Sequence, residues 1–300
     1  MKTKRIAVLM GGPSSERAVS LETGKGVHEA LLSLGYQAVA LDWRPDISLP
    51  RALEEAGIEA VWNALHGTFG EDGAVQGLLA CMNIPCTGSG LLASALAMDK
   101  IASKRVFESH GIPTPAWEIW TEGTPLQTAF PLVVKPANEG SSVGVGVVFE
   151  PSELGAALAE ATKHRGPVLV EEYIEGSEVF VGVLDQSTLG TIEVRPAKGF
   201  YDYEAKYERG DTEYLIPAPI SEALSDSLQK LALDAHRALG CQSYSRVDIR
   251  VRDNGEAFVL EVNTLPGMTG QSLMPKLAEH AGISYPELCE QILKLAVREA

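Results

Sequence analysis

The polar side chains most suited to chemistry lie near the C-terminus, in two short runs where polar and apolar residues alternate: Arg246, Asp248, Glu261 and Asn263. Residues 253–255 (Asp-Asn-Gly) separate the runs, and Asn-Gly between alternating runs is the strongest short-range signal for a β-hairpin. With Asn-Gly as a two-residue loop, Asp248 faces Glu261 and Arg246 faces Asn263. Facing carboxylates lie roughly 5 Å apart at Cβ and repel each other. A hard divalent cation such as Mg²⁺, which prefers oxygen ligands, is the simplest reason for such a pair.

The opposite face of this predicted hairpin is apolar. The same register gives three apolar pairs: Val247 with Val262, Ile249 with Leu260, and Val251 with Phe258. The alternative is an ordinary half-buried hairpin whose polar face is solvated. A register error of one residue would separate the two carboxylates, because it turns every side chain to the other face.

Further candidate groups lie upstream. Lys135 interrupts an apolar strand at 131–137, so its side chain either reaches water past apolar neighbours or meets an anion. The glycine-rich turn that follows, residues 139–144, contains Ser141 and Ser142 and could fold over phosphates, although most such turns are only turns. His66 follows an apolar strand and precedes a glycine-rich loop, which suits a ligand site and a structural histidine equally. The patterns around Lys100, Glu171 and Glu172 are also typical of ordinary solvent-exposed side chains.

The composition excludes several classes of function. The chain has 300 residues, enough for two or three domains, and its net charge of −15 argues against nucleic-acid binding. No apolar run approaches the roughly 20 residues that span a bilayer. The sequence has no Walker A motif and no CxxC pair among Cys81, Cys86, Cys241 and Cys289. We therefore expect free thiols in a cytoplasmic protein.

The chain order predicts where these side chains are held. Residues 1–98 read as β-α-β-α-β, which indicates a parallel sheet with helices on its faces, and ligands bind at the carboxyl ends of such strands. The first helix is expected from Ser20, a good N-cap, to about Leu34. Residues 99–183 read as an α+β lid and residues 184–300 as a second α+β unit. Within it, residues 198–216 are expected to form one long loop, and loops of this length are usually functional.

Together these stretches resemble the D-alanine–D-alanine ligases of the ATP-grasp superfamily. The resemblance covers most of the chain and rests on these motifs: GGPSSERAVS, ALHGTFGEDGAVQG, TGSG with MDK, VVKPANEGSSVGV, FYDYEAKY, and RVDIRV with FVLEVNTLPGMTGQSLMP. It implies an α/β (α+β in parts) ATP-grasp fold. An N-terminal Rossmann-like domain (1–98), a central lid domain (99–183) and a C-terminal domain (184–300) would enclose the nucleotide.

The resemblance also implies an activity and assigns residues to it. ATP and a first D-alanine would form an acyl phosphate, which the amine of a second D-alanine attacks, and the dipeptide serves peptidoglycan synthesis. Two Mg²⁺ ions, or Mn²⁺ in their place, would bind Asp248, Glu261 and Asn263. Nucleotide binding would fall to Lys100, Lys135, Ser142, Glu171, Glu172, Ile174, Glu178 and Lys206. The catalytic set would be Glu16, Ser141, Tyr207, Arg246 and the N–H of Gly267, and substrate contacts would come from His66, Glu71, Ser272 and Leu273.

The acceptor is the point on which related enzymes differ. The complete YDYEAKY loop, with Tyr207, favours D-alanine over D-lactate or D-serine. Thr68-Phe69 departs from the Arg that many relatives have in this loop, but affects none of the assigned residues. Two alternatives stay open: an ATP-grasp ligase with another acceptor, and a non-catalytic binding protein on the same scaffold. We further expect a homodimer, with no nucleic-acid or membrane partner.

Overall fold

The computed structural model describes residues 1–140, 142–164, 166–196 and 212–296 of the chain. Its strands are β1 (Arg5–Gly11), β2 (Gln37–Trp43), β3 (Ala60–Asn63), β4 (Trp117–Ile119), β5 (Leu132–Pro136), β6 (Gly146–Val148), β7 (Val168–Glu172), β8 (Ser177–Leu184), β9 (Ser187–Arg195), β10 (Glu213–Leu215), β11 (Tyr244–Val251) and β12 (Ala257–Asn263). Its helices are α1 (Arg17–Ser33), α2 (Leu49–Glu55), α3 (Ala74–Cys81), α4 (Leu91–Met98), α5 (Lys100–Ser109), α6 (Pro151–Ala161), α8 (Glu222–Ala238), α9 (Leu273–His280) and α10 (Tyr285–Lys294).

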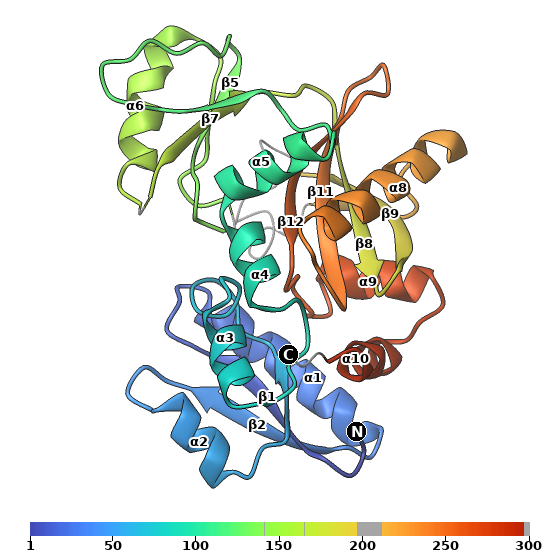
Figure 1. Cartoon of the computed structure of the whole chain (residues 1–300). Helices are drawn as coiled ribbons and strands as arrows, with labels where there is room; N and C mark the ends of the chain where they lie inside the picture. The colour runs from blue at the N-terminus through green and yellow to red at the C-terminus, as the bar shows by residue number, and fades with distance from the viewer. Residues whose placement is uncertain (141, 165, 197–211, 297–300) are drawn as a thin grey trace.

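The strands form three sheets. The N-terminal sheet has the order β2-β1-β3, the central sheet β4-β7-β5-β6, and the C-terminal sheet β10-β9-β8-β11-β12. In Figure 1 the N-terminal sheet lies at the bottom, the central sheet with α6 at the upper left, and the C-terminal sheet at the right. Helices α4 and α5 run between them, so the chain passes from the first sheet to the other two through this pair.

The N-terminal sheet is parallel, as the β-α-β-α-β pattern predicts. Alternate residues of β1 face opposite sides, because side chains of a strand point alternately up and down. Ile6 and Val8 pack in a core with residues of α1, while Ala7 and Leu9 pack with residues of α2 and α3. The carboxyl ends of β1 and β3 therefore meet at one edge, where residues 12–16 and 64–73 follow.

The predicted start of the first helix is wrong. Helix α1 begins at Arg17 with Glu16 as the N-cap residue, and Ser20 lies inside the helix. The Ser20 hydroxyl is buried, donates to the Ala64 carbonyl (2.7 Å) and accepts from the Gly11 N–H (2.8 Å). These contacts to strand ends far away in the sequence use the hydroxyl that a local pattern assigns to capping. They also hold the Glu16 turn against the edge of the sheet.

The C-terminal sheet is antiparallel, and its two faces have different partners. On one face Val247 and Ile249 join a core with Leu228 and other residues of α8. On the other face Phe180 and Ile192 pack with residues of α9, α10 and β1. Residues 198–216 were expected to form one long loop, and this is wrong at its C-terminal end. Residues 213–215 form β10, which pairs with β9. The rest of that loop, 198–211, lies outside the described residues.

Strand pairing also bears on the expected units. Strand β8 pairs with β9 and β11, so it belongs to the C-terminal sheet rather than to the central one. The predicted boundary between the lid domain and the C-terminal domain, at residue 183, placed nearly all of β8 in the lid domain. The division of the chain into three domains stays a prediction. All four cysteines are free thiols, as expected. No helix within the described residues has the length and apolar character that crossing a membrane requires.

Candidate active site

Two adjoining cavities lie between the sheets. The first, of about 230 Å³, is lined by central and C-terminal residues: Lys100, Val133, Lys135, Pro136, Glu139, Gly140, Ser142, Val143, Val145, Val147, Glu171–Ile174, Glu178, Asp248, Arg250, Leu260 and Glu261. The second, of about 70 Å³, is lined by Glu16, His66, Glu71, Ala97, Met98, Lys100, Gly140, Arg246, Glu261, Val262, Asn263, Thr264 and Gly267. Lys100, Gly140 and Glu261 line both. A molecule in one cavity therefore reaches a molecule in the other at these three residues.

The hairpin of β11 and β12 forms the floor of this junction. Asp248 pairs with Glu261, Val247 with Val262 and Arg246 with Asn263. The register predicted from the sequence is confirmed at the end of the hairpin that carries the polar residues. Arg246 and Asn263 line the second cavity, Asp248 the first, and Glu261 both.

The register is wrong at the turn end of the same hairpin. The Gly255 N–H bonds to the Arg252 carbonyl (2.9 Å), and the Arg252 N–H bonds to the Glu256 carbonyl (2.8 Å). The loop thus has three residues, 253–255, with Gly255 at φ +89° as a left-handed position requires. Consequently Ile249 pairs with Val259 rather than Leu260, and Val251 pairs with Ala257 rather than Phe258.

A β-bulge restores the pairing closer to the active site. The register shifts between Asp248 and Ile249, where Leu260 is the extra residue of β12. A bulge of one residue offsets the displacement that the longer loop introduces. Leu260 therefore leaves the apolar face of the hairpin and lines the first cavity. The predicted carboxylate pair is present because these two deviations cancel.

Cationic side chains pair with Asp248 and Glu261, the two carboxylates expected to bind metal. The Arg246 Nε and Nη2 donate to the two carboxylate oxygens of Asp248, each at 2.7 Å. Lys100 Nζ lies 3.2 Å from Glu261 Oε2, and the Leu265 N–H donates to Asn263 Oδ1 at 2.9 Å. This bidentate arginine contact is a strong, charge-assisted geometry. The two carboxylates are thus held in place by positive charge, and the Asn263 oxygen by a backbone N–H.

The donor set fits a hard cation that keeps part of its own coordination shell. Two carboxylates and one amide oxygen suit Mg²⁺, which commonly takes its other ligands from water and substrate phosphates. Across the described ranges no three His, Cys, Asp or Glu side chains are close enough to hold a metal by themselves. Any metal at this hairpin would therefore need further oxygen ligands from a bound phosphate or from water.

A buried cluster of opposite charges forms one end of the first cavity. Glu171 forms ion pairs with Lys135 through Oε1 and with Lys104 through Oε2, the latter at 2.8 Å. Burial by itself raises the pKa of the Glu171 carboxyl, but the two lysine charges outweigh it and hold that pKa at about 2. Burial lowers the pKa of Lys104 despite the attraction of Glu171. Glu171 is thus an ionised anchor for Lys135.

Lys104 was missed in the sequence. Its side chain is fully buried and also donates to Thr114 Oγ1 (2.8 Å) and the Pro115 carbonyl (3.3 Å). The available signal was its spacing, because Lys100 and Lys104 are four residues apart and share one face of a helix. That pattern is common on solvated helices, so only the packing of α5 against β7 distinguishes this pair.

The expected nucleotide residues within the described ranges lie together. Lys100, Lys135, Ser142, Glu171, Glu172, Ile174 and Glu178 all line the first cavity. Glu172 pairs with Arg252. The carbonyl of Ile174 accepts from Arg250 Nε at 3.1 Å. Lys206 lies outside the described residues.

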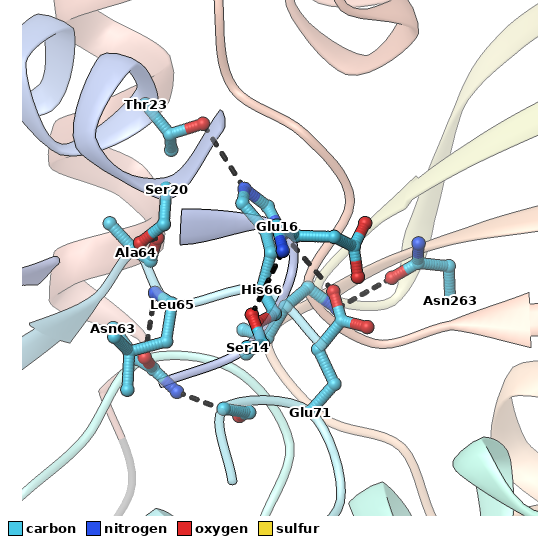
Figure 2. Close-up of polar contacts among 12 residues, drawn as sticks. Ser14, Glu16, Ser20, Thr23, Asn63, Ala64, Leu65, His66, Glu71 and Asn263 are labelled. Atoms are coloured by element: carbon cyan, nitrogen blue, oxygen red, sulfur yellow. Dashed lines mark hydrogen bonds and ion pairs between the residues drawn. The ribbon is translucent and has the colours of Figure 1, made fainter. Parts of the chain in front are cut away.

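The second cavity joins residues of the N-terminal part to the hairpin. Figure 2 shows Glu16, His66 and Glu71 around the space that Asn263 of β12 also faces. The His66 ring lies between two partners, Glu71 Oε1 at 3.2 Å from Nδ1 and Thr23 Oγ1 at 3.1 Å from Nε2. His66 is buried, so these contacts fix the orientation of its ring.

The turn that carries Glu16 is tied to the His66 segment. The Ser14 hydroxyl donates to the His66 carbonyl (2.6 Å) and accepts from the Glu16 N–H (3.2 Å). A side chain at Gly67 would lie 2.7 Å from Glu16 Oε2, and one at Gly140 would lie 3.7 Å from the same atom. The Glu16 carboxylate thus reaches from the first sheet to the glycine-rich turn of the central sheet. Ser14 and Thr23 were also missed, because isolated hydroxyls carry no motif.

The remaining expected residues are near the second cavity or undescribed. Gly267 lines the cavity, and a side chain there would meet Ser272 Oγ at 2.7 Å. Ser272 is the N-cap residue of α9 and Leu273 its first residue, so both lie at a helix N-terminus, which favours anions. The Ser272 N–H itself donates to the Thr269 carbonyl at 2.9 Å. Neither residue lines the cavity itself. Ser141 and Tyr207 lie outside the described residues.

Comparisons with known proteins agree with this geometry. The family description "D-ala D-ala ligase C-terminus" matches residues 106–294, and "D-ala D-ala ligase N-terminus" matches residues 45–89. A D-alanine–D-alanine ligase of Citrifermentans bemidjiense is 51% identical over 298 residues, covering 99% of this chain and 97% of that protein. One of Syntrophotalea carbinolica is 50% identical and covers 98% of this chain and 96% of that protein.

Solved structures extend the comparison to the fold. A crystal structure of D-alanine–D-alanine ligase from Bacillus anthracis matches with a TM-score of 0.86 at 39% identity, covering 97% of both chains. A crystal structure of a D-alanine–D-alanine ligase from Bacillus anthracis complexed with ATP matches with a TM-score of 0.85 at 36% identity, again covering 97% of both chains. The ATP-grasp fold expected from the motifs is therefore confirmed. By sequence, family match and fold, the chain belongs to the D-alanine–D-alanine ligase family.

Proposed function

We propose that this protein joins two D-alanine molecules to D-alanyl-D-alanine, converting ATP to ADP and phosphate. The observation that supports this most is the junction of the two cavities at Lys100, Gly140 and Glu261. A reaction that activates a carboxylate with ATP needs the terminal phosphate and the carboxylate to meet at one charged point. The first cavity suits the nucleotide and the second the amino acids.

The nucleotide would lie with its base among Glu171, Glu172 and Ile174 and its ribose at Glu178. Lys100 and Lys135, with Lys206, would neutralise the phosphate charge, and Ser142 would contact the phosphates from the glycine-rich turn. Lys135 has a fixed direction because it is paired with Glu171. The transferred phosphate would then lie near Lys100 and the hairpin, where the two cavities meet.

Asp248, Glu261 and Asn263 would hold two Mg²⁺ ions, or Mn²⁺. When bound, the metal neutralises charge on the phosphates as the phosphoryl group is transferred. Arg246 donates two hydrogen bonds to Asp248, and Lys100 pairs with Glu261. The two cationic side chains would therefore keep the carboxylates oriented toward the junction of the two cavities.

The first D-alanine would bind in the second cavity. Glu16 would bind its ammonium group and orient it together with Ser141 and Tyr207, while His66 and Glu71 would lie beside the substrate. One carboxylate oxygen of this D-alanine attacks the γ-phosphorus, and ADP leaves, giving D-alanyl phosphate. Enclosure matters at this stage, because water would hydrolyse the acyl phosphate.

The second D-alanine would bind through its carboxylate at Ser272 and Leu273, where the N-terminus of α9 offers N–H groups. Its amine, after losing a proton, attacks the acyl carbon and forms a tetrahedral intermediate. Arg246 and the Gly267 N–H would donate to the oxyanion. Phosphate then leaves as the peptide bond forms.

An assay of ADP formation tests the proposal directly. Purified protein with ATP and Mg²⁺ is expected to release ADP only when D-alanine is added, together with one dipeptide per ADP. Arms with D-alanine plus D-lactate or D-serine measure the acceptor preference, for which D-alanine is expected. Absence of D-alanine-stimulated ADP formation contradicts the proposal.

Family membership also supports two further parts of the proposal: a homodimer, and a place in the cytoplasm where peptidoglycan precursors are made. Light scattering after gel filtration measures the first, with a mass near twice 32.1 kDa expected. Cell fractionation measures the second.

A further inference from the structure

Arg250 lines the first cavity, and the residues that surround it hold it rigidly. Its Nε donates to the Ile174 carbonyl at 3.1 Å, and its guanidinium lies 5.7 Å from the centre of the Tyr173 ring. Its Nη1 lies 3.6 Å from Glu178 Oε2. The side chain is only 14% exposed. A guanidinium with this many fixed partners adopts one orientation at little further cost in conformational entropy.

The pairing of Arg250 with Glu178 is built into the sheet. Arg250 of β11 and Glu178 of β8 are directly opposed residues of the antiparallel ladder. Opposite charges at such positions attract each other, and the register cannot shift without moving the apolar face of β11 out of the core. The carboxylate of Glu178 therefore has a cation beside it whenever the sheet is formed.

Strand periodicity relates Arg250 to the residues of the proposed reaction. Arg246, Asp248 and Arg250 are two residues apart, so they share one face of β11 at intervals of roughly 7 Å. Arg246 lines the second cavity, and Asp248 and Arg250 line the first. Along this face the strand passes from the amino-acid cavity, through the phosphate region, to the ribose and base region.

We propose that Arg250 is a positioning residue that holds the Glu178 carboxylate for the ribose hydroxyls of the nucleotide. This inference rests on the proposed function, which places the ribose at Glu178. A carboxylate that accepts from a hydroxyl must be correctly turned, and the charge of Arg250, with Nη1 3.6 Å from Glu178 Oε2, attracts the carboxylate in one direction. Removing Arg250 takes this cation away from the Glu178 carboxylate, whose side chain is 20% exposed. Discrimination between a ribose and a deoxyribose is the property that depends on this arrangement.

Calorimetric binding of ADP, 2′-deoxyADP and 3′-deoxyADP to the full-length protein in Mg²⁺ tests the inference. The wild type is expected to bind ADP roughly tenfold or more tightly than at least one deoxy analogue, as expected for a hydrogen bond to a charged group. Arg250→Met is expected to remove most of that preference, and Glu178→Gln is expected to do the same. The double variant is expected to resemble either single variant, because both disrupt one interaction.

Arg252→Met is the matched control. Arg252 is the next arginine on the same face and is absent from the lining of the first cavity. It pairs with Glu172 on the base side of the cavity and with Glu256, and the base is the same in ADP and in both deoxy analogues. It is expected to keep the wild-type ratio between ADP and the deoxy analogues. Arg250→Lys keeps the charge without the planar fork and is expected to give an intermediate ratio. Thermal unfolding of each variant identifies those that fail to fold.

The outcomes separate this inference from the proposed function. If the wild type discriminates between the sugars and Arg250→Met and Arg250→Lys keep its ratio, the role of Arg250 is refuted. If the wild type does not discriminate, the placement of the ribose at Glu178 is refuted as well. If ADP binding discriminates but D-alanine does not stimulate ADP formation, the proposed function fails while the role of Arg250 stands.

Discussion

Asp248 and Glu261 are directly opposed on neighbouring strands of one hairpin, although both are carboxylates. Each has its own cation, Arg246 for Asp248 and Lys100 for Glu261. The first comes from the same strand and the second from α5, so the charge balance of the hairpin depends on a contact between distant parts of the chain. Glu261 is also the member of the pair that lines both cavities.

Glu261→Gln is expected to lower the turnover of the D-alanine-dependent reaction by about 100-fold or more, because a neutral amide holds a cation less well than a carboxylate does. Steady-state ADP formation at increasing Mg²⁺ measures this. Glu256→Gln is the control, since Glu256 belongs to the same hairpin but is 54% exposed and pairs with Arg252. Turnover near that of the wild type in Glu261→Gln would refute the metal-binding role.

Lys104→Met is expected to lower the free energy of unfolding by roughly 3–5 kcal/mol, because one partner of a buried charge cluster is removed. It is also expected to raise the KM for ATP, since Lys135 then becomes the main partner of Glu171. Urea unfolding and ADP formation measure the two effects. Lys163→Met, at an exposed ion pair, is expected to change stability by about 0.5 kcal/mol or less. A Lys104→Met variant as stable as the wild type would contradict the importance of the cluster.

Gly67→Ala is expected to raise the KM for D-alanine while leaving ADP binding unchanged. Gly67 has φ +67°, and its new Cβ would lie 2.7 Å from Glu16 Oε2, so the Glu16 carboxylate must move. Gly57→Ala is the control, because Gly57 has φ +62° with no atom within 4 Å and imposes the backbone strain alone. Equal effects of the two substitutions on the KM would show that the displacement of Glu16 is unimportant.

His236 is expected to make the protein less stable as the pH falls. Burial, aided by the charge of Arg237, lowers the pKa of this histidine from 6.5 to about 4. Between pH 6.5 and about pH 4, His236 binds a proton in the unfolded chain but not in the folded protein. Its contribution to the free energy of unfolding is therefore fully present above pH 6.5 and is lost as the pH falls toward 4. The shift corresponds to roughly 3 kcal/mol.

Urea unfolding of the wild type and of His236→Gln at several pH values between 4.5 and 7.5 measures this effect. The difference in stability between the two proteins is expected to shrink as the pH falls, because only the wild type must keep the histidine neutral. His110→Gln, at an exposed position, is expected to follow the wild type. A difference that stays constant over this range would contradict the prediction.

Local patterns were sufficient for the two strands of the hairpin, but the pairing of Asp248 with Glu261 also needed the bulge at Leu260 that offsets the longer loop. The alternation of 246–251 and 257–263 predicts a strand pair with an apolar face, since side-chain direction in a strand has a period of two. The same patterns could not place Ser20, whose hydroxyl binds groups at the ends of β1 and β3 instead of capping α1. Propensity is a local quantity, and a contact between distant segments overrides it.

By itself, the sequence determined the family and the parallel first sheet, because motifs and the order of local patterns are properties of neighbouring residues. Only the tertiary structure decided that Leu260 bulges into the cavity, that Lys104 is buried beside Glu171, and that Arg250 faces Glu178. The first follows from the register within one hairpin, and the other two from packing or register between segments that are far apart in the chain. The type of a residue determines which interactions its side chain can form. The tertiary structure determines which other residue is close enough to form them.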